Sequence, residues 1–131
     1  MTLSVNAVLP YPPSVNRYWR SVKGRAILSS EARAYRREVV SMFAARRFTG
    51  SNDIGRLEPM RGRLSMTMTL FPPDKRRRDL DNAFKAPLDA LAHAGVYEDD
   101  SQIDVLTIRR GAVMGDMASC HVQIEEITDG R

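Results

Sequence analysis

The sequence predicts an α/β domain in which two main helices pack on a small mixed β-sheet, in the order β-loop-α-β-α-β-β. Three observations indicate this class. Residues 64–70 alternate apolar and polar side chains, as a half-buried strand does. Two longer segments, at about 29–48 and 81–94, instead repeat apolar residues at helical spacing. The length of 131 residues suits one domain, spanning residues 1–131.

The N-terminal part is expected to contain a strand, a long loop and the first helix. Residues 3–9 place apolar side chains at every second position, which predicts a strand, and the prolines that follow end it because proline cannot donate to a sheet ladder. Residues 14–28 are polar, basic and aromatic, so we expect a long loop or an irregular ribbon there. Ser29 or Ser30 can cap a helix that continues to about Phe48. The apolar stripe of this helix consists of Tyr35, Val39, Met42 and Phe43.

A second helix is expected over residues 81–94. Gly95 is placed to end this helix in a left-handed conformation. Pro87 lies inside the segment and predicts either a kink or a later start, because proline has no amide hydrogen to donate. The apolar face of the helix is formed by Leu80, Phe84, Leu88 and Leu91.

The remaining segments complete the predicted sheet. Residues 49–62 are rich in Gly, Asn, Asp and Pro, and we interpret them as a loop. Two last strands are expected at about 105–113 and 120–127, joined by a turn around Gly115 and Asp116.

Charge is distributed unevenly along the chain, whose formal net charge is +4. Residues 1–47 contain nine Lys or Arg against two Glu, whereas residues 98–129 contain eight acidic side chains against two basic ones. This uneven distribution of charge suits a protein whose basic part attracts a polyanion and whose acidic part brings several carboxylates together. An unevenly charged, solvated surface explains it equally well.

The single cysteine, Cys120, excludes an internal disulfide and fits a reducing compartment. No apolar run approaches the roughly 20 residues needed to span a bilayer. We therefore expect a cytoplasmic protein with no membrane partner.

The segment most informative about chemistry is residues 75–85, KRRRDLDNAFK. Four cations lead directly into Asp79 and Asp81, which bracket Leu80 where a strand exits and a helix begins. There Leu80 can point into the core while both carboxylates point outward. Phosphodiester hydrolysis uses Mg²⁺ or Mn²⁺, and these hard cations prefer carboxylate oxygens. Two clustered aspartates with a third from elsewhere would give a minimal open metal site, and the cations would hold a DNA strand against it.

Each part of this cluster also has a purely structural explanation. Asp79 can be a helix N-cap and Asp81 a favourable acid in the first turn. Lys85 lies one helical turn beyond Asp81 and one turn before Asp89. It can stabilise charge on a phosphate, but its spacing alone favours an ordinary i,i+4 ion pair.

A third carboxylate is available from Asp99 and Asp100 if the chain doubles back directly after the second helix. Otherwise this acidic turn is a solvated loop.

Residues 14–28 interleave cations with two aromatic rings. The cations can grip phosphates while a ring stacks on an unpaired base. Alternatively, Tyr18 and Trp19 anchor the segment to the core and the arginines are solvated. We expect a combination of the two, in which one aromatic ring is buried in the core and the cations contact DNA. The candidate DNA-binding residues in this segment are Asn16, Arg17, Tyr18, Arg20, Lys23 and Arg25.

Two blocks of sequence resemble the RusA family of Holliday-junction resolvases. One is RRRDLDNAFKAPLDALAHAGVYEDDSQI, and the other is LPYPPSVNRYWR followed by GR and SSEARAYR. The blocks occur in the family's order and together cover most of residues 3–104. The resemblance implies a RusA-like mixed α/β fold, a homodimer, and Mg²⁺ or Mn²⁺ without an organic cofactor.

The same resemblance assigns roles to individual residues. It implies that Asp79, Asp81 and Asp100 are the metal-binding catalytic aspartates. It also implies that Lys85 is an essential lysine, whereas the spacing of Lys85 alone favours an ion pair. It also implies that the arginines before the first aspartate engage DNA; these are Arg76, Arg77 and Arg78.

The resulting hypothesis is a Mg²⁺-dependent endodeoxyribonuclease that resolves four-way (Holliday) junctions by paired symmetric nicks. One alternative is a nuclease acting on other branched DNA, such as flaps or forks. Another is a junction-binding protein without catalysis, although DNA binding alone does not require three carboxylates beside a basic surface. A nucleotide-processing enzyme is disfavoured because the sequence has no phosphate-cradling glycine loop.

Overall fold

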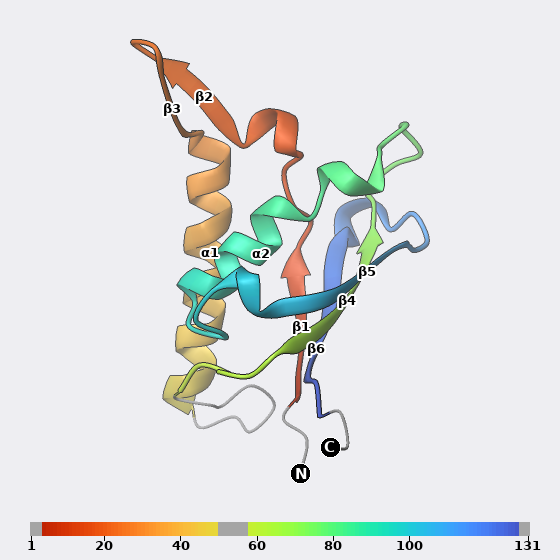
Figure 1. The fold of residues 1–131 in the computed structure, drawn as a ribbon. Coiled ribbons are helices and arrows are strands. Elements are labelled where there is room, and N and C mark those ends of the chain that lie inside the picture. Colours follow the sequence, from red (N-terminus) through yellow and green to blue (C-terminus); the bar gives the residue numbers. More distant parts are fainter. Residues whose placement is uncertain (1–3, 50–57, 129–131) are drawn as a thin grey trace.

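The computed structural model describes residues 4–49 and 58–128. In this part of the chain, two α-helices lie on the same side of a four-stranded mixed sheet, and a separate two-stranded hairpin projects beyond one end of the longer helix (Figure 1). The elements in chain order are β1 (Ser4–Pro10), η1 (Val15–Arg17), β2 (Trp19–Val22), β3 (Arg25–Leu28), α1 (Ser30–Thr49), β4 (Leu64–Phe71), η2 (Leu80–Asn82), α2 (Lys85–His93), η3 (Asp100–Gln102), β5 (Ile103–Arg110), η4 (Gly115–Met117) and β6 (Ser119–Glu126), where η marks a 3₁₀ helix. The predicted fold class is confirmed.

The large sheet has the strand order β1-β6-β4-β5. Strand β6 pairs antiparallel with both β1 and β4, while β4 and β5 are parallel and are connected through α2. Alternation along β1, β4 and β6 buries one set of side chains beneath the helices, as the period of two predicts. That buried set comprises Val5, Ala7, Leu9, Leu64, Met66, Met68, Leu70, Cys120, Val122 and Ile124.

The opposite face of the sheet is left uncovered by the two helices. It is hollowed and lined by polar side chains, among them Asn6, Thr67, Thr69 and Gln123, together with apolar ones such as Val8. At one end of the hollow, the rings of Phe71 and His121 pack with centroids 4.6 Å apart.

Helix α1 begins where the sequence predicts. The Ser29 hydroxyl accepts a hydrogen bond from the Ala32 amide at 3.1 Å, so Ser29 is the N-cap. The predicted stripe faces the core: Tyr35, Val39 and Phe43 are buried, and Met42 packs against them.

Helix α2 begins later than expected, at Lys85 rather than at residue 81. Pro87 explains the late start, because it occupies the first turn, where an amide hydrogen has no intrahelical acceptor. Gly95 follows the helix with a φ of 81°, the left-handed conformation that the sequence predicts.

The expectation of a loop or irregular ribbon over residues 14–28 is corrected by the structure. Strands β2 and β3 pair as an antiparallel hairpin. Its two-residue turn places Lys23 at φ 52° and Gly24 at φ 76°, and such paired positive values match the right-handed twist of the strands.

Other boundaries also differ from the expectations. Most of the predicted loop at 49–62 lies outside the described residues, but Met60 forms a parallel bridge with Tyr97. Strand β5 occupies Ile103–Arg110 rather than 105–113, and residues 111–118 connect it to β6. No described helix is long and apolar enough to cross a membrane.

Candidate functional site

The first two candidate ligands occupy one short turn. Asp79 stands at the N-cap position of η2 with extended backbone angles, yet its side chain makes no capping hydrogen bond. The backbone closes the turn instead, through an Asn82 amide that donates to the Asp79 carbonyl at 3.1 Å. Leu80 packs against the core while Asp79 and Asp81 are exposed, as the sequence predicts. Capping therefore does not account for Asp79.

The arginines before this turn differ from one another. Arg78 is half-buried: its Nη1 donates to Asp74 Oδ1 at 2.7 Å, and its guanidinium lies over the Tyr11 ring at 5.8 Å. The hydrogen bond from Arg78 lowers the pKa of Asp74 to about 2. The carbonyl of Arg78 accepts a hydrogen bond from Arg110.

These contacts fix the backbone immediately before Asp79. Arg78 therefore holds this loop in place, and its predicted contact with DNA stays a prediction. Arg76 and Arg77 remain exposed, in the position expected for phosphate contacts.

Lys85 is the first residue of α2 and is half-buried. The ion pair with Asp89 that its spacing favours is not formed, because Arg36 of α1 occupies that carboxylate. The Arg36 Nη2 and Nε atoms donate to Asp89 Oδ2 at 2.6 and 3.1 Å. Burial would raise the pKa of Asp89, but hydrogen bonds from Arg36 and Tyr18 outweigh it, and the pKa lies below its usual range.

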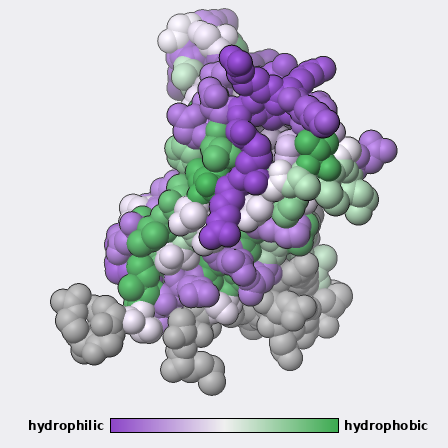
Figure 2. All heavy atoms as spheres, turned by 90° about the vertical axis from the view of Figure 1, so that its right-hand side faces the viewer, coloured by the Kyte–Doolittle hydropathy of each residue, from purple (hydrophilic) through white to green (hydrophobic). Residues whose placement is uncertain are grey.

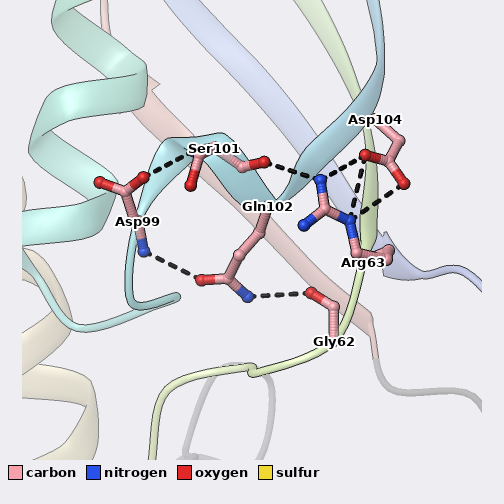
Figure 3. A network of polar contacts seen from close by, with 6 residues as sticks. All are labelled: Gly62, Arg63, Asp99, Ser101, Gln102 and Asp104. Carbon is pink, nitrogen blue, oxygen red and sulfur yellow. Dashed lines mark hydrogen bonds and ion pairs between the residues drawn. The ribbon is translucent and has the colours of Figure 1, made fainter.

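The turn at Asp99 and Asp100 is held by a network of polar contacts (Figure 3). Asp99 caps η3 by accepting from the Ser101 amide at 3.0 Å. Hydrogen bonding from the Ser101 side chain, and secondarily from its amide, lowers the pKa of Asp99. Gln102 completes a capping box with Asp99. Asp99 is therefore structural, which leaves Asp100 as the carboxylate available for a ligand.

Gln102 is the centre of this network and is only 8% exposed. Its amide nitrogen donates to the carbonyls of Met60 and Gly62, both at 2.9 Å. Its amide oxygen accepts from the amides of Glu98 and Asp99, at 2.8 and 2.9 Å. The side chain thus fastens the turn that carries Asp100 to the segment entering β4.

A second contact supports the same turn from outside. Arg63 donates to the Ser101 carbonyl at 2.8 Å and pairs with Asp104 at 2.5 Å (Figure 3). Both side chains of the pair are largely exposed, so water competes for their hydrogen bonds.

The chain does double back after α2, as a third ligand requires. The buried Tyr97 hydroxyl donates to the Leu88 carbonyl at 2.7 Å, which brings the returning segment alongside the helix. Strand β5 then runs to η2 and contacts it. Asp79 and Asp81 share one turn, but no three His, Cys, Asp or Glu side chains among the described residues are grouped closely enough to hold a metal ion. The complete set with Asp100 stays a prediction.

The hairpin places one aromatic ring inside and one outside. Tyr18 is 2% exposed and Trp19 is 49% exposed, with the two rings edge-on and their centroids 5.1 Å apart. One aromatic ring is buried, as expected, but Tyr18 is too buried to contact DNA, and Trp19 presents the accessible ring. That the cations contact DNA stays a prediction. The remaining candidates of this segment are exposed: Asn16, Arg17, Arg20, Lys23 and Arg25.

Hydrophilic residues dominate the upper part of the face shown in Figure 2, at the level of the hairpin and of residues 72–79. Hydrophobic residues are exposed beside them. Three of the exposed apolar side chains belong to the connection between β5 and β6: Val113, Met114 and Met117.

Comparison with known proteins identifies clear relatives. The family described as Endodeoxyribonuclease RusA matches residues 10–125. A crossover junction endodeoxyribonuclease rusA from Enterobacteria phage 82 is 48% identical over 96 residues, which cover 72% of each chain. The protein of the same name from Enterobacteria phage HK97 is 40% identical over 107 residues, covering 79% of this chain and 80% of the relative. The Escherichia coli K12 protein is 44% identical over 95 residues, or 72% of each chain.

Proposed function

The chain belongs to the endodeoxyribonuclease RusA family of nucleases, and we propose that it resolves four-way DNA junctions by Mg²⁺-dependent, paired symmetric nicks. The observation that carries this proposal is a division among the aspartates. Four of them are engaged by protein groups: Asp74, Asp89, Asp99 and Asp104. Within the described residues, the carboxylates of Asp79, Asp81, Asp100 and Asp116 make no hydrogen bond or ion pair. The first three belong to the block of sequence that resembles the RusA family, whereas Asp116 lies outside it, in η4.

The chemistry of these three side chains suits a hard divalent cation, which prefers carboxylate oxygens. Asp79, Asp81 and Asp100 would hold Mg²⁺ (or Mn²⁺). When bound, the cation would polarise the phosphate and lower the pKa of a coordinated water. The exposed positions of Asp79 and Asp81 leave the site open to a phosphodiester from solvent.

The surrounding cations have separate roles in the proposed reaction. The exposed Lys75, Arg76 and Arg77 hold the strand through its phosphates. Lys85 keeps its ammonium available because Arg36 occupies Asp89, so Lys85 can stabilise negative charge that develops on the phosphate oxygens.

A homodimer would present two such sites to the two symmetric strands of a four-way junction. Exposed apolar side chains support a protein interface on this chain: Val8 is 48% exposed on the uncovered sheet face, and Met114 and Met117 line a neighbouring hollow. We place the dimer contact on this face.

The proposal is tested by cleavage of end-labelled substrates with Mg²⁺ and with EDTA. The panel contains a four-way junction, a fork, a flap and a linear duplex. The proposed function predicts paired cuts in opposite strands of the four-way junction, only with the metal. Preferential cutting of the fork or flap would favour a nuclease on other branched DNA.

The carboxylate's role is tested by comparing Asp81→Asn with Glu58→Gln, which neutralises an exposed carboxylate elsewhere. Asp81→Asn should bind the junction without cutting it, whereas Glu58→Gln should cut normally. Tight, uncut binding by the wild type in both Mg²⁺ and Mn²⁺ would instead identify a non-catalytic junction-binding protein.

A further inference from the structure

We propose that Asp89 is a positioning residue that couples the β2–β3 hairpin to helix α2, and so sets the hairpin's cations relative to Lys85. This inference rests on the proposed function, because it assigns the hairpin to DNA and Lys85 to the reacting phosphate. Asp89 itself contacts neither.

The contacts of Asp89 come from three elements. Arg36 of α1 donates two hydrogen bonds to Oδ2, at 2.6 and 3.1 Å. The Tyr18 hydroxyl, at the base of the hairpin, faces the same carboxylate and interacts with it. His93, one turn further along α2, places Nε2 3.9 Å from Oδ1. One carboxylate thus joins the hairpin base, the long helix and the helix that begins with Lys85.

Two further hydrogen bonds in the described part of the chain hold the hairpin at its base. The Ser29 amide donates to the Tyr18 carbonyl at 2.9 Å, and the Ser29 hydroxyl donates to the Arg17 carbonyl at 2.5 Å. Beyond these contacts, the two strands project past the N-terminal end of α1 (Figure 1). A small rotation at Tyr18 would therefore be amplified into a large displacement of the hairpin tip.

The partners of Asp89 fix this base firmly. Tyr18 is almost fully buried, and the Asp89 side chain is only 26% exposed. Removing the carboxylate would leave the Arg36 guanidinium partly buried without its partner, a costly arrangement. The link therefore holds Tyr18 against α2 more rigidly than an exposed ion pair would.

Asp89 lies one helical turn beyond Lys85 on the same helix. A DNA strand bound by the exposed cations of the hairpin is thereby held at a fixed distance from Lys85 and from the adjacent turn that carries Asp79 and Asp81. Such preorganisation accelerates a reaction more than it tightens binding, because it removes misaligned bound states. Loss of the link should therefore reduce cleavage more than affinity.

The test uses Asp89→Asn, Tyr18→Phe and the double variant, with Asp89→Glu as the conservative rescue and Glu58→Gln as the charge control. Trp19 is the only tryptophan in the chain and packs edge-on against Tyr18, so its fluorescence anisotropy reports the hairpin base directly. Junction affinity and single-turnover cleavage at saturating protein are measured on the same samples.

We expect Asp89→Asn and Tyr18→Phe each to lower the Trp19 anisotropy. Cleavage should fall about tenfold while affinity changes by less than about threefold. The double variant should be no worse than Asp89→Asn, because both substitutions break one link. Asp89→Glu should recover part of the lost cleavage rate, and Glu58→Gln should match the wild type.

The proposal is overturned if Trp19 anisotropy and the cleavage rate of both single variants equal those of the wild type, or if the two substitutions act additively. If Asp89→Asn does not fold, the conservative Tyr18→Phe variant decides the question alone. Failure of the wild type to cut any branched substrate would refute the proposed function, but the anisotropy comparison would still decide whether Asp89 holds the hairpin.

Discussion

Replacement of Gln102 by Met should loosen the turn that carries Asp100. Methionine keeps the length of the side chain but removes the amide, so the Met60 and Gly62 carbonyls lose their donor and the Glu98 and Asp99 amides lose their acceptor. The side chain is 8% exposed, which leaves little room for water to replace the lost partners.

The size of the effect follows from these four hydrogen bonds. Each contributes about 1 kcal/mol net, and some of the buried groups left behind carry a further penalty. Improved burial of an apolar side chain offsets part of the loss. We therefore expect the free energy of unfolding to fall by about 2–4 kcal/mol.

Urea unfolding followed by circular dichroism measures this change, with Arg63→Met as the matched control. Arg63 supports the same turn, but its exposed guanidinium and Asp104 are readily solvated, so its loss should destabilise much less. At temperatures where Gln102→Met remains folded, its junction cleavage should be slower while its junction binding is retained.

Two results would refute this reasoning. A destabilisation by Gln102→Met no larger than that by Arg63→Met would show that the buried amide does not fasten the turn. Unchanged cleavage by a destabilised but folded Gln102→Met variant would show that the turn does not position Asp100.

Four further predictions concern other parts of the molecule. Burial raises the pKa of all four tyrosines, that of Tyr18 to about 12, and also the pKa of the Cys120 thiol, so the folded state holds protons that the unfolded chain releases. The stability should therefore fall as the pH rises from about 9 to 12, and tyrosinate absorbance should increase in parallel above about pH 10. Arg77→Gln should weaken junction binding and lower its salt dependence by about one phosphate contact with the fold intact. Arg78→Gln should instead return the pKa of Asp74 from about 2 toward its usual value and slow cleavage more than binding, as NMR titration and single-turnover rates would show. Met117→Glu, at a side chain that is 72% exposed, should shift a dimer toward monomer in sedimentation without destabilising the protomer, and an unchanged dimer would place the interface elsewhere.

The sequence predicted those elements of the fold that bury one regular face. Residues 64–70 alternate because every second side chain lies beneath the helices, and the stripe from Tyr35 to Phe43 reflects the same burial at helical spacing. Strand β5 was placed less accurately because most of its side chains are exposed at the edge of the sheet. The hairpin was missed because its strands are exposed, and only Gly24 gave a local signal for its turn.

The candidate site likewise contains residues that local sequence predicts and residues that depend on the folded structure. Asp79 and Asp81 were identified because the local pattern places Leu80 inward and both carboxylates outward. The choice between Asp99 and Asp100 could not be made from sequence, because it depends on which carboxylate reaches the Ser101 amide. The pairing of Asp89 with Arg36 was also inaccessible, because residues far apart in the chain meet only through the packing of α1 on α2.

The central claim is that free carboxylates, rather than acidic residues in general, perform the cleavage. The adjacent Asp99 and Asp100 test it most directly, in a junction-cleavage assay with Mg²⁺ that compares Asp99→Asn with Asp100→Asn. Asparagine can still cap η3, so Asp99→Asn should cut the junction at close to the wild-type rate. Asp100→Asn should bind the junction and leave it uncut. Cleavage retained by Asp100→Asn but lost by Asp99→Asn would contradict the assignment.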